Sequence, residues 1–173
     1  VGHVLPFMSE FKLLADAVAD GRWGKILGGH FMRTIGPVDW NPDFYDPQKV
    51  GGPLVDLHVH DTHLIRLLFG MPTGLHARGR LRQGVPQYFE VLYEFTDANL
   101  VVASSGGVID QHGRPFTHGF EAHFERATVQ FISAGFDDGS EAMPLKILHQ
   151  GGGIERPSLG ASDPVDAFVA EIN

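Results

Sequence analysis

Cysteine is absent from the 173 residues, so the chain can form no disulfide, no thiolate metal site and no thiol nucleophile. No apolar run approaches the length of a membrane span or a signal peptide. Basic residues are few, with 13 Lys and Arg against 21 Asp and Glu, and they form no cluster. The resulting net charge of −8 argues against a nucleic-acid-binding face. We therefore expect neither nucleic acid nor a membrane as partner, and the cytoplasm as the default location.

Phosphate-binding glycine motifs are missing as well. The sequence contains one G-x-G, Gly151-Gly152-Gly153, and Arg156 stands where a third glycine of a dinucleotide fingerprint would be. No G-x4-G-K occurs either. We expect that this chain does not bind a nicotinamide cofactor by itself.

The composition that remains is that of an ordinary globular domain, with 43% hydrophobic and 20% charged residues. A chain of this length can bury one proper core. It starts inside an apolar stretch, Val1–Leu5, which we expect to form a short strand. It stops inside a helical pattern that follows Asp163-Pro164. We therefore expect residues 1–173 to be a single domain excised from a longer protein.

Helical patterns dominate the first half of the chain and strand patterns the second. One helix is expected from Ser9 as N-cap to about Ala19, ended by Gly21. Another is expected between Pro53 and Gly70. The strands follow one another through short turns such as Asp97-Ala98-Asn99, so they should pair antiparallel. We predict an α+β fold: an open, mostly antiparallel sheet with helices on one face.

Apolar residues occur on both faces of the strand near residues 88–95. Val91, Tyr93 and Phe95 are assigned to one face, and Leu92 with Phe89 to the other. A sheet that is apolar on both faces needs a partner for the face without helices. We expect a homodimer or higher oligomer through that face.

The stretch between Pro53 and Gly70 carries the most chemistry. On a helix Asp56, His60 and His63 stand at i, i+4 and i+7 and share a face. A carboxylate one turn before a histidine can orient the imidazole and stabilise its charged form, as a general acid–base pair requires. The same spacing is also common in purely structural polar pairs.

The order Gly-Gly-x3-Asp-x3-His-Asp-x2-Leu, starting at Gly51, is followed by Leu-Leu-Phe-Gly-x-Pro from Leu67. Together they resemble the C-terminal domain of the glucose–fructose oxidoreductase / inositol dehydrogenase family (Gfo/Idh/MocA). The stretch Val1–Phe7 is similar to the family's passage into this domain. Residues 21–26, Gly-Arg-Trp-Gly-Lys-Ile, are similar to its G-x-I-G-K-I turn.

The resemblance implies a dihydrodipicolinate-reductase-like C-terminal domain that serves for substrate binding and oligomerisation. The N-terminal Rossmann domain, which holds NAD or NADP, would be absent from these residues. The implied substrate is a sugar, inositol or related polyol. His60 would accept the proton of the substrate hydroxyl while hydride passes to the nicotinamide, with Asp56 in support. The family often has glycine at His58 and aspartate at His63.

Other contacts to the substrate are expected from His63, Trp40, Tyr45 and Arg33, and contacts to the cofactor only near Gly52. His118 could also touch a polyol, although each of these residue types is more commonly structural. No metal site is expected: a metal held by His60, His63 and Asp56 is less favoured, because further ligands are needed. Two other functions stay open. One is a non-catalytic ligand-binding or oligomerisation module, and the other, less favoured, is a metal-dependent hydrolase using His58-x-His60.

Overall fold

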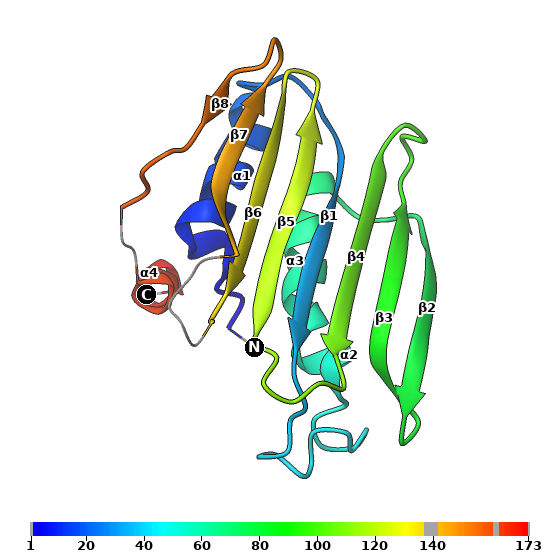
Figure 1. Ribbon diagram of the computed structural model, residues 1–173. Helices are drawn as coiled ribbons and strands as arrows, with labels where there is room; N and C mark the ends of the chain where they lie inside the picture. Colours follow the sequence, from blue (N-terminus) through cyan, green and yellow to red (C-terminus); the bar gives the residue numbers. More distant parts are fainter. Residues whose placement is uncertain (1, 137–141, 161–162, 173) are drawn as a thin grey trace.

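One open sheet forms the centre of the molecule (Figure 1). The computed structural model describes residues 2–136, 142–160 and 163–172, and in these the sheet has eight strands in the order β2-β3-β4-β1-β5-β6-β7-β8. The strands are β1 Ile26–Ile35, β2 Gly74–Arg82, β3 Val85–Glu94, β4 Val101–Val108, β5 Thr117–Phe124, β6 Ala127–Ala134, β7 Met143–His149 and β8 Ile154–Glu155. Strands β1 and β4 run parallel, and the other pairings are antiparallel. The predicted α+β class is confirmed.

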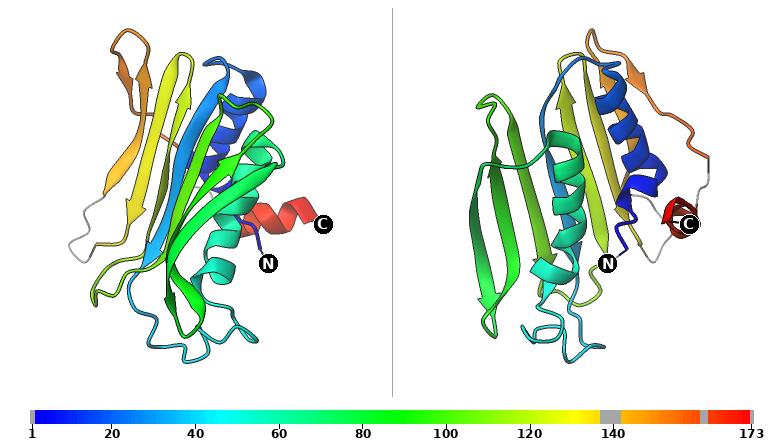
Figure 2. Two further views of the ribbon diagram at one scale, coloured as in Figure 1. Left: turned by 90° about the vertical axis from the view of Figure 1, so that its right-hand side faces the viewer. Right: turned by 180° about the vertical axis from the view of Figure 1, so that it is seen from behind.

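Helices cover one face of this sheet (Figure 2). They are the 3₁₀-helix η1 Leu5–Phe7 and the α-helices α1 Ser9–Asp20, α2 Pro53–Asp56 and α3 His58–Phe69, whereas α4 Pro164–Ile172 lies at the side and contacts η1. Helices α1 and α3 lie along the strands, whereas β2 and β3 extend beyond them. None of the helices in the described ranges has the length and apolar character needed to cross a membrane.

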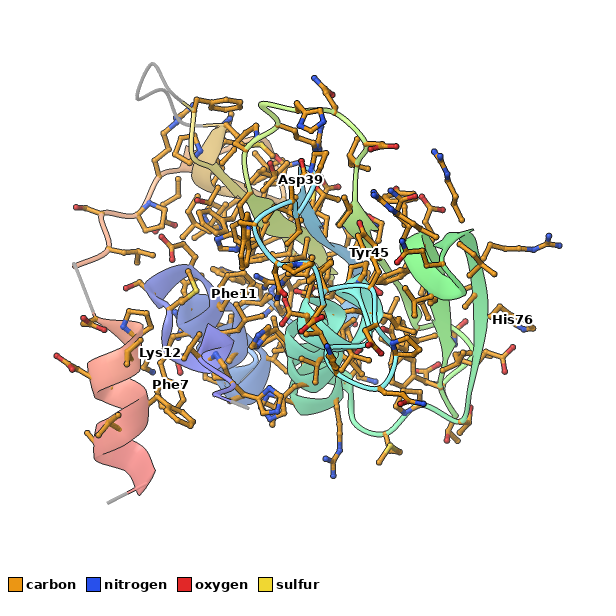
Figure 3. All side chains as sticks on the ribbon, turned by 90° about the horizontal axis from the view of Figure 1, so that it is seen from below. Phe7, Phe11, Lys12, Asp39, Tyr45 and His76 are labelled. Carbon is orange, nitrogen blue, oxygen red and sulfur yellow. The ribbon has the colours of Figure 1, made fainter. Side chains whose placement is uncertain are left out.

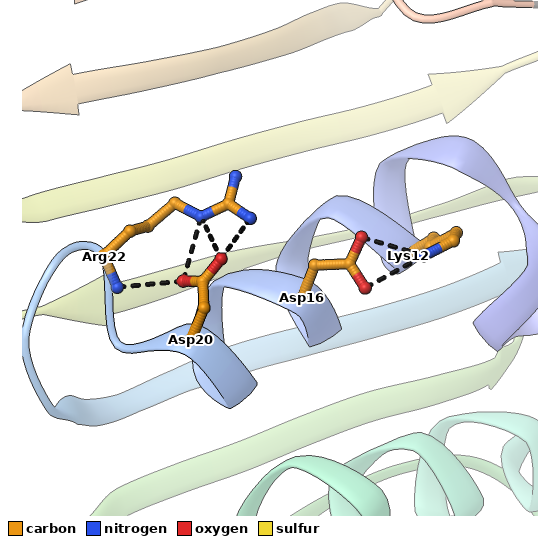
Figure 4. Close-up of polar contacts among 4 residues, drawn as sticks. All are labelled: Lys12, Asp16, Asp20 and Arg22. Atoms are coloured by element: carbon orange, nitrogen blue, oxygen red, sulfur yellow. Dashed lines mark hydrogen bonds and ion pairs between the residues drawn. The ribbon is translucent and has the colours of Figure 1, made fainter.

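Helix α1 shows why this layer forms. Phe11, Leu14 and Ala17 are buried and join the main core against the sheet. The opposite, exposed side carries the ion pairs Lys12–Asp16 and Arg22–Asp20 (Figure 4). Gly21 ends the helix in the left-handed region at φ 65°, where glycine fits best. Apolar spacing on one side and charge on the other thus orient the helix.

The N-terminal stretch differs from the sequence-based expectation. Leu5–Phe7 forms a 3₁₀-helix instead of extending Val1–Leu5 as a strand, and Val4 already has helical dihedral angles. Pro6 at the start of the turn favours this conformation because its ring fixes φ. Leu5 is buried in the main core. The described part of the N-terminal segment therefore packs among the helices and does not pair with a strand of the sheet.

The face of the sheet without helices carries only some of the apolar residues that the sequence assigned to it. Phe89, Val91 and Tyr93 are all buried on the helix side, because residues two apart on a strand share a face. The assignment of Phe89 to the open face was wrong. Leu92 and Val101 are exposed on the open face, beside the half-buried Ala103 that pairs with Leu92.

A second, smaller core organises the loop after β1. Its buried members are Val38, Phe44, Tyr45, Val85 and Val108. The loop residues Asp39 and Tyr45 lie near the end of the sheet from which α2 starts (Figure 3). The loop closes through backbone bonds from Gly51 N to Asp46 O and from Gly52 N to Phe44 O, both 2.8 Å. This small core therefore fixes where the chain enters α2.

Gly107 offers a test of the register between β3 and β4. It pairs with Tyr88, has φ 127°, and an added Cβ would collide with the carbonyl oxygen of Gln87. We predict that Gly107→Ala lowers the free energy of unfolding by about 2–5 kcal/mol, through backbone strain and overpacking. Gly135→Ala is the matched control, since open space surrounds it, and should change stability by less than about 0.5 kcal/mol. Urea unfolding measures both; equal stabilities of the two variants would contradict this register.

Candidate active site

The predicted helix between Pro53 and Gly70 is interrupted at Leu57. Gly51 and Gly52 have φ of 83° and 72°, which lets the loop turn sharply into α2 with Pro53 in its first turn. Leu57 keeps right-handed dihedral angles (φ −98°, ψ −52°) between α2 and α3. The backbone at Leu57 therefore remains in the helical region, but Asp56 belongs to α2 and His60 to α3.

A buried ion pair joins α3 to the middle of the sheet. Arg33 of β1 donates from Nε to Asp61 Oδ2 at 3.0 Å and from Nη2 to Asp61 Oδ1 at 3.1 Å. The two side chains are only 7% and 2% exposed. Burial raises the pKa of the Asp61 carboxyl, while the charge and bonds of Arg33 oppose that rise. Two parallel bonds from a planar guanidinium fix both the distance and the orientation of the helix.

A second polar anchor lies one helical turn earlier. His58 Nε2 lies 2.7 Å from Ser104 Oγ and 3.1 Å from the Tyr93 hydroxyl, and Nδ1 lies 3.2 Å from Thr62 Oγ1. Burial lowers the pKa of His58 to about 4, and the charge of Arg33 contributes. His58 is therefore a neutral, hydrogen-bonded core residue near pH 7. Its hydrogen-bond partners lie on β3, β4 and the next turn of α3, and they include neither Asp56 nor His60.

Three histidines gather on another side of α3. The ring of His3, from the N-terminal segment, stacks on His63 with centroids 4.0 Å apart. The same ring meets His60 edge-on at 5.9 Å. The Nδ1 atoms of His3, His60 and His63 are buried and have no hydrogen-bond partner among the described residues. Buried polar atoms are usually hydrogen-bonded, so these three nitrogens are an exception in the core of the described chain.

The surroundings favour the neutral form of His60 and His63. Burial lowers the pKa of His60 most, and the charges of Arg33, His3 and His63 lower it further, while Asp56 acts in the opposite direction. Burial also lowers the pKa of His63, followed by His3 and Arg66. A histidine that is neutral at pH 7 can accept a proton.

Asp56 is exposed at the end of α2. Within the described part of the chain, no hydrogen bond joins it to His60. Its influence on the imidazole is therefore electrostatic. The two side chains thus do not form the expected hydrogen-bonded pair, and Asp56 contributes only a negative charge near the ring of His60.

A groove of about 530 Å³ runs along α2 and α3. Its polar lining residues are His3, His58, Thr62, His63 and Arg66, and it contains no carboxylate. His60 lies next to this groove through its contact with His3 rather than in its wall. In the described ranges no group of three or more His, Asp or Glu side chains is arranged to hold a metal ion.

The other residues expected to touch a substrate lie apart from this groove. The guanidinium of Arg33 is occupied by Asp61, and the ring of Tyr45 is buried in the loop core, 4.6 Å from the Arg82 guanidinium. Trp40 is 76% exposed on the loop. His118 is buried against Phe11, Phe116 and Phe131, and burial lowers its pKa to about 4. Gly52 is buried beside Val85.

Sequence reasoning missed Asp61 and His3. Asp61 is spaced three, four and seven residues before Leu64, Ile65 and Leu68, all buried on the sheet side of α3. A lone carboxylate in such an apolar stripe needs a buried partner. Arg33 follows Phe31 on the same face of β1 and was the natural candidate. No local pattern marks His3, whose contacts depend on the 3₁₀ turn that follows it.

Solved structures share this fold over nearly the whole chain. A putative oxidoreductase from Thermotoga maritima matches with a TM-score of 0.75 and 15% identity, covering 96% of this chain and 50% of that protein. KijD10, a 3-ketoreductase from Actinomadura kijaniata solved as a mutant with TDP-benzene and NADP, matches at 0.73 and 16%, covering 98% and 51%. UDP-N-acetylglucosamine 3-dehydrogenase GnnA from Acidithiobacillus ferrooxidans matches at 0.70 and 17%, covering 99% and 51%.

The chain thus spans about half the length of these proteins. The comparison with curated protein sequences found no match. The family model of the GFO/IDH/MocA C-terminal domain matches residues 11–130, which include most of α1, all of α2 and α3, and the strands up to the first half of β6. The chain therefore belongs to the GFO/IDH/MocA C-terminal domain family.

Proposed function

We propose that this chain is the substrate-binding and catalytic half of an NAD(P)-dependent oxidoreductase that acts on a hydroxyl of a sugar, inositol or related polyol. The observation that carries the proposal is the family match across α2 and α3, where burial holds His60 in its neutral form. The names of the structural relatives, a sugar-nucleotide dehydrogenase and a ketoreductase solved with NADP, agree with this substrate class.

His60 is the proposed general base. An alcohol carbon gives up hydride readily only if the hydroxyl proton leaves as well, so a neutral imidazole within reach of that proton lowers the barrier. The charge of Asp56 favours the imidazolium that forms and acts against the burial of the ring. His63, on the wall of the groove, is the proposed contact to a substrate hydroxyl.

The described residues do not fit the binding of a whole dinucleotide. Gly151 and Gly152 belong to the turn between β7 and β8, and Arg156 follows that hairpin. The nicotinamide, held mainly by a Rossmann domain of the parent protein, would supply the hydride acceptor. The part that falls to this chain is to place the substrate and to receive its proton.

A second candidate is a non-catalytic ligand-binding or oligomerisation module. The exposure of Asp56 and the lack of a hydrogen bond between it and His60 in the described residues favour this alternative. It predicts that the three histidines hold the N-terminal segment against α3 and do nothing more. The two candidates differ in what a substitution at His60 changes.

We predict that His60→Asn in the full-length parent lowers turnover by about 10²- to 10⁴-fold, the usual contribution of a general base. The melting temperature should change little, because Asn stays polar in a half-buried position. His112→Asn is the control, since its side chain is 82% exposed on a loop. If His60→Asn keeps its turnover but loses several degrees in melting temperature, the structural alternative is correct.

The 173-residue chain alone should show no saturable binding of NAD(H) or NADP(H) in calorimetric titration. The physical reason is the missing phosphate-binding turn after a strand. Tight binding with a stoichiometry near one would show that this domain holds the cofactor itself, and would overturn the proposed division between the two domains.

We also propose that two or more copies associate through the open face of the sheet. Leu92 and Val101 are 46% and 64% exposed there.

Light scattering at tens of micromolar, roughly the working range of the method, should give a dimer or higher oligomer. Leu92→Lys should shift it toward monomer, because a charge would be buried in the interface. Leu75→Lys is the control, because Leu75 is exposed and pairs with Tyr93 on the helix side of the sheet. A monomeric wild-type chain would contradict this association.

A further inference from the structure

We propose, on the basis of the proposed function, that Arg33 and Asp61 are positioning residues for His60. Their buried ion pair fixes the turn of α3 that carries His60 and sets the charge next to its ring. Neither residue lines the groove, so they act through His60 and not on the substrate.

The geometry supports this role. Arg33 lies in β1, which the sheet order places between β4 and β5, and Asp61 lies in the first turn of α3. Two bonds of 3.0 and 3.1 Å join the planar guanidinium to both carboxylate oxygens. Such a fork resists both rotation of the helix and sliding along its axis. The pair therefore ties α3 to the centre of the sheet.

His60 is the residue just before Asp61. Successive side chains on an α-helix point about 100° apart, since 3.6 residues make one turn. When Asp61 is held against the sheet, His60 is turned toward the N-terminal segment, where it meets His3. A small rotation of α3 would move the imidazole nitrogen away from a substrate, and misplacement by about 1 Å can cost a hundredfold in rate.

The charges around His60 come from four places. Arg33 faces it from β1, His3 from the N-terminal segment, Asp56 from α2, and His63 from the next turn of α3. The charge of Arg33 lowers the pKa of His60, second only to burial, and Asp56 raises it. Arg33 is the permanent cation of this set, because a guanidinium in a protein does not lose its proton.

A purely structural ion pair and a positioning pair predict different results. If the pair only stabilises the fold, folded variants should leave the pKa of His60 where it is. If the pair sets the charge at His60, removing Arg33 should raise that pKa and removing Asp61 should lower it, since the cation then stands uncompensated. Opposite shifts from the two halves of one pair are not expected from loosened packing.

The test is an NMR titration of the histidine ring signals in the 173-residue chain, with His60 identified by its loss in His60→Asn. We expect Arg33→Gln to raise the pKa of His60 by about 0.5–1 pH unit and Asp61→Asn to lower it. Arg33→Gln/Asp61→Asn leaves no unpaired buried charge, should fold, and should also raise the pKa, because Arg33 acts on His60 more than its partner does. Asp16→Asn, which breaks the exposed Lys12–Asp16 pair on α1, is the matched control.

If either single variant fails to fold, the double variant decides. An unchanged pKa of His60 in the folded double variant would overturn the proposal. This readout does not depend on catalysis, so it stands apart from the proposed function, which fails if His60→Asn keeps full turnover.

In the parent protein the same variants should move the acidic limb of the kcat/KM profile with the pKa of His60. Arg33→Lys keeps the cation but loses the two-pronged geometry, so we expect the limb to stay in place while kcat falls by about tenfold or more. KM should change less than kcat, because neither residue lines the groove. Full kcat in Arg33→Lys would contradict the positioning role.

Discussion

The structure depends on one buried ion pair, between Arg33 on β1 and Asp61 on α3. Two charges taken out of water are tolerated only when both are paired, and removal of one partner typically costs about 3–5 kcal/mol. The pair therefore has one stable arrangement, in which α3 lies at a fixed rotation over the sheet. The hydrogen bonds of His58 to Ser104 and Tyr93 reinforce that rotation from the preceding turn.

This rotation gives α3 one buried side and one half-buried side. His58, Asp61, Leu64 and Ile65 are buried toward the sheet. His60 and His63 meet His3 on a side that is only half-buried. His58, His60 and His63 stand within six residues of one another on α3, yet their environments differ. His58 has hydrogen-bond partners for both nitrogens, whereas His60 and His63 each keep a buried nitrogen without one among the described residues.

The fold could be predicted from the sequence because its signals are local. Three of these signals depend only on neighbouring residues: the apolar spacing at Leu14 and Ala17, the helix end at Gly21 and the turn at Asp97. The structure contains all three features. The assignment of Phe89 failed because the alternation along β3 was misapplied. The strand expected at the N-terminus failed because packing of Leu5, which is not local, overrode its apolar pattern.

The candidate site was less predictable, because its contacts join distant parts of the chain. Arg33 and Asp61 are 28 residues apart, and His3 and His63 lie farther apart still. The spacing of Asp56 and His60 assumed an unbroken helix, and the interruption at Leu57 is not marked by glycine or proline. The motif therefore pointed to the stretch that forms α2 and α3, but not to the residues that surround His60 there.

The central claim is that His60 takes the proton of the reacting hydroxyl. The most direct measurement is a crystal structure of the full-length parent with nicotinamide cofactor and a bound polyol substrate. The account predicts that a ring nitrogen of His60 lies about 2.6–3.2 Å from the hydroxyl whose carbon faces the nicotinamide. A substrate whose reacting hydroxyl contacts another base, with His60 turned toward His3 and away from it, would contradict the account.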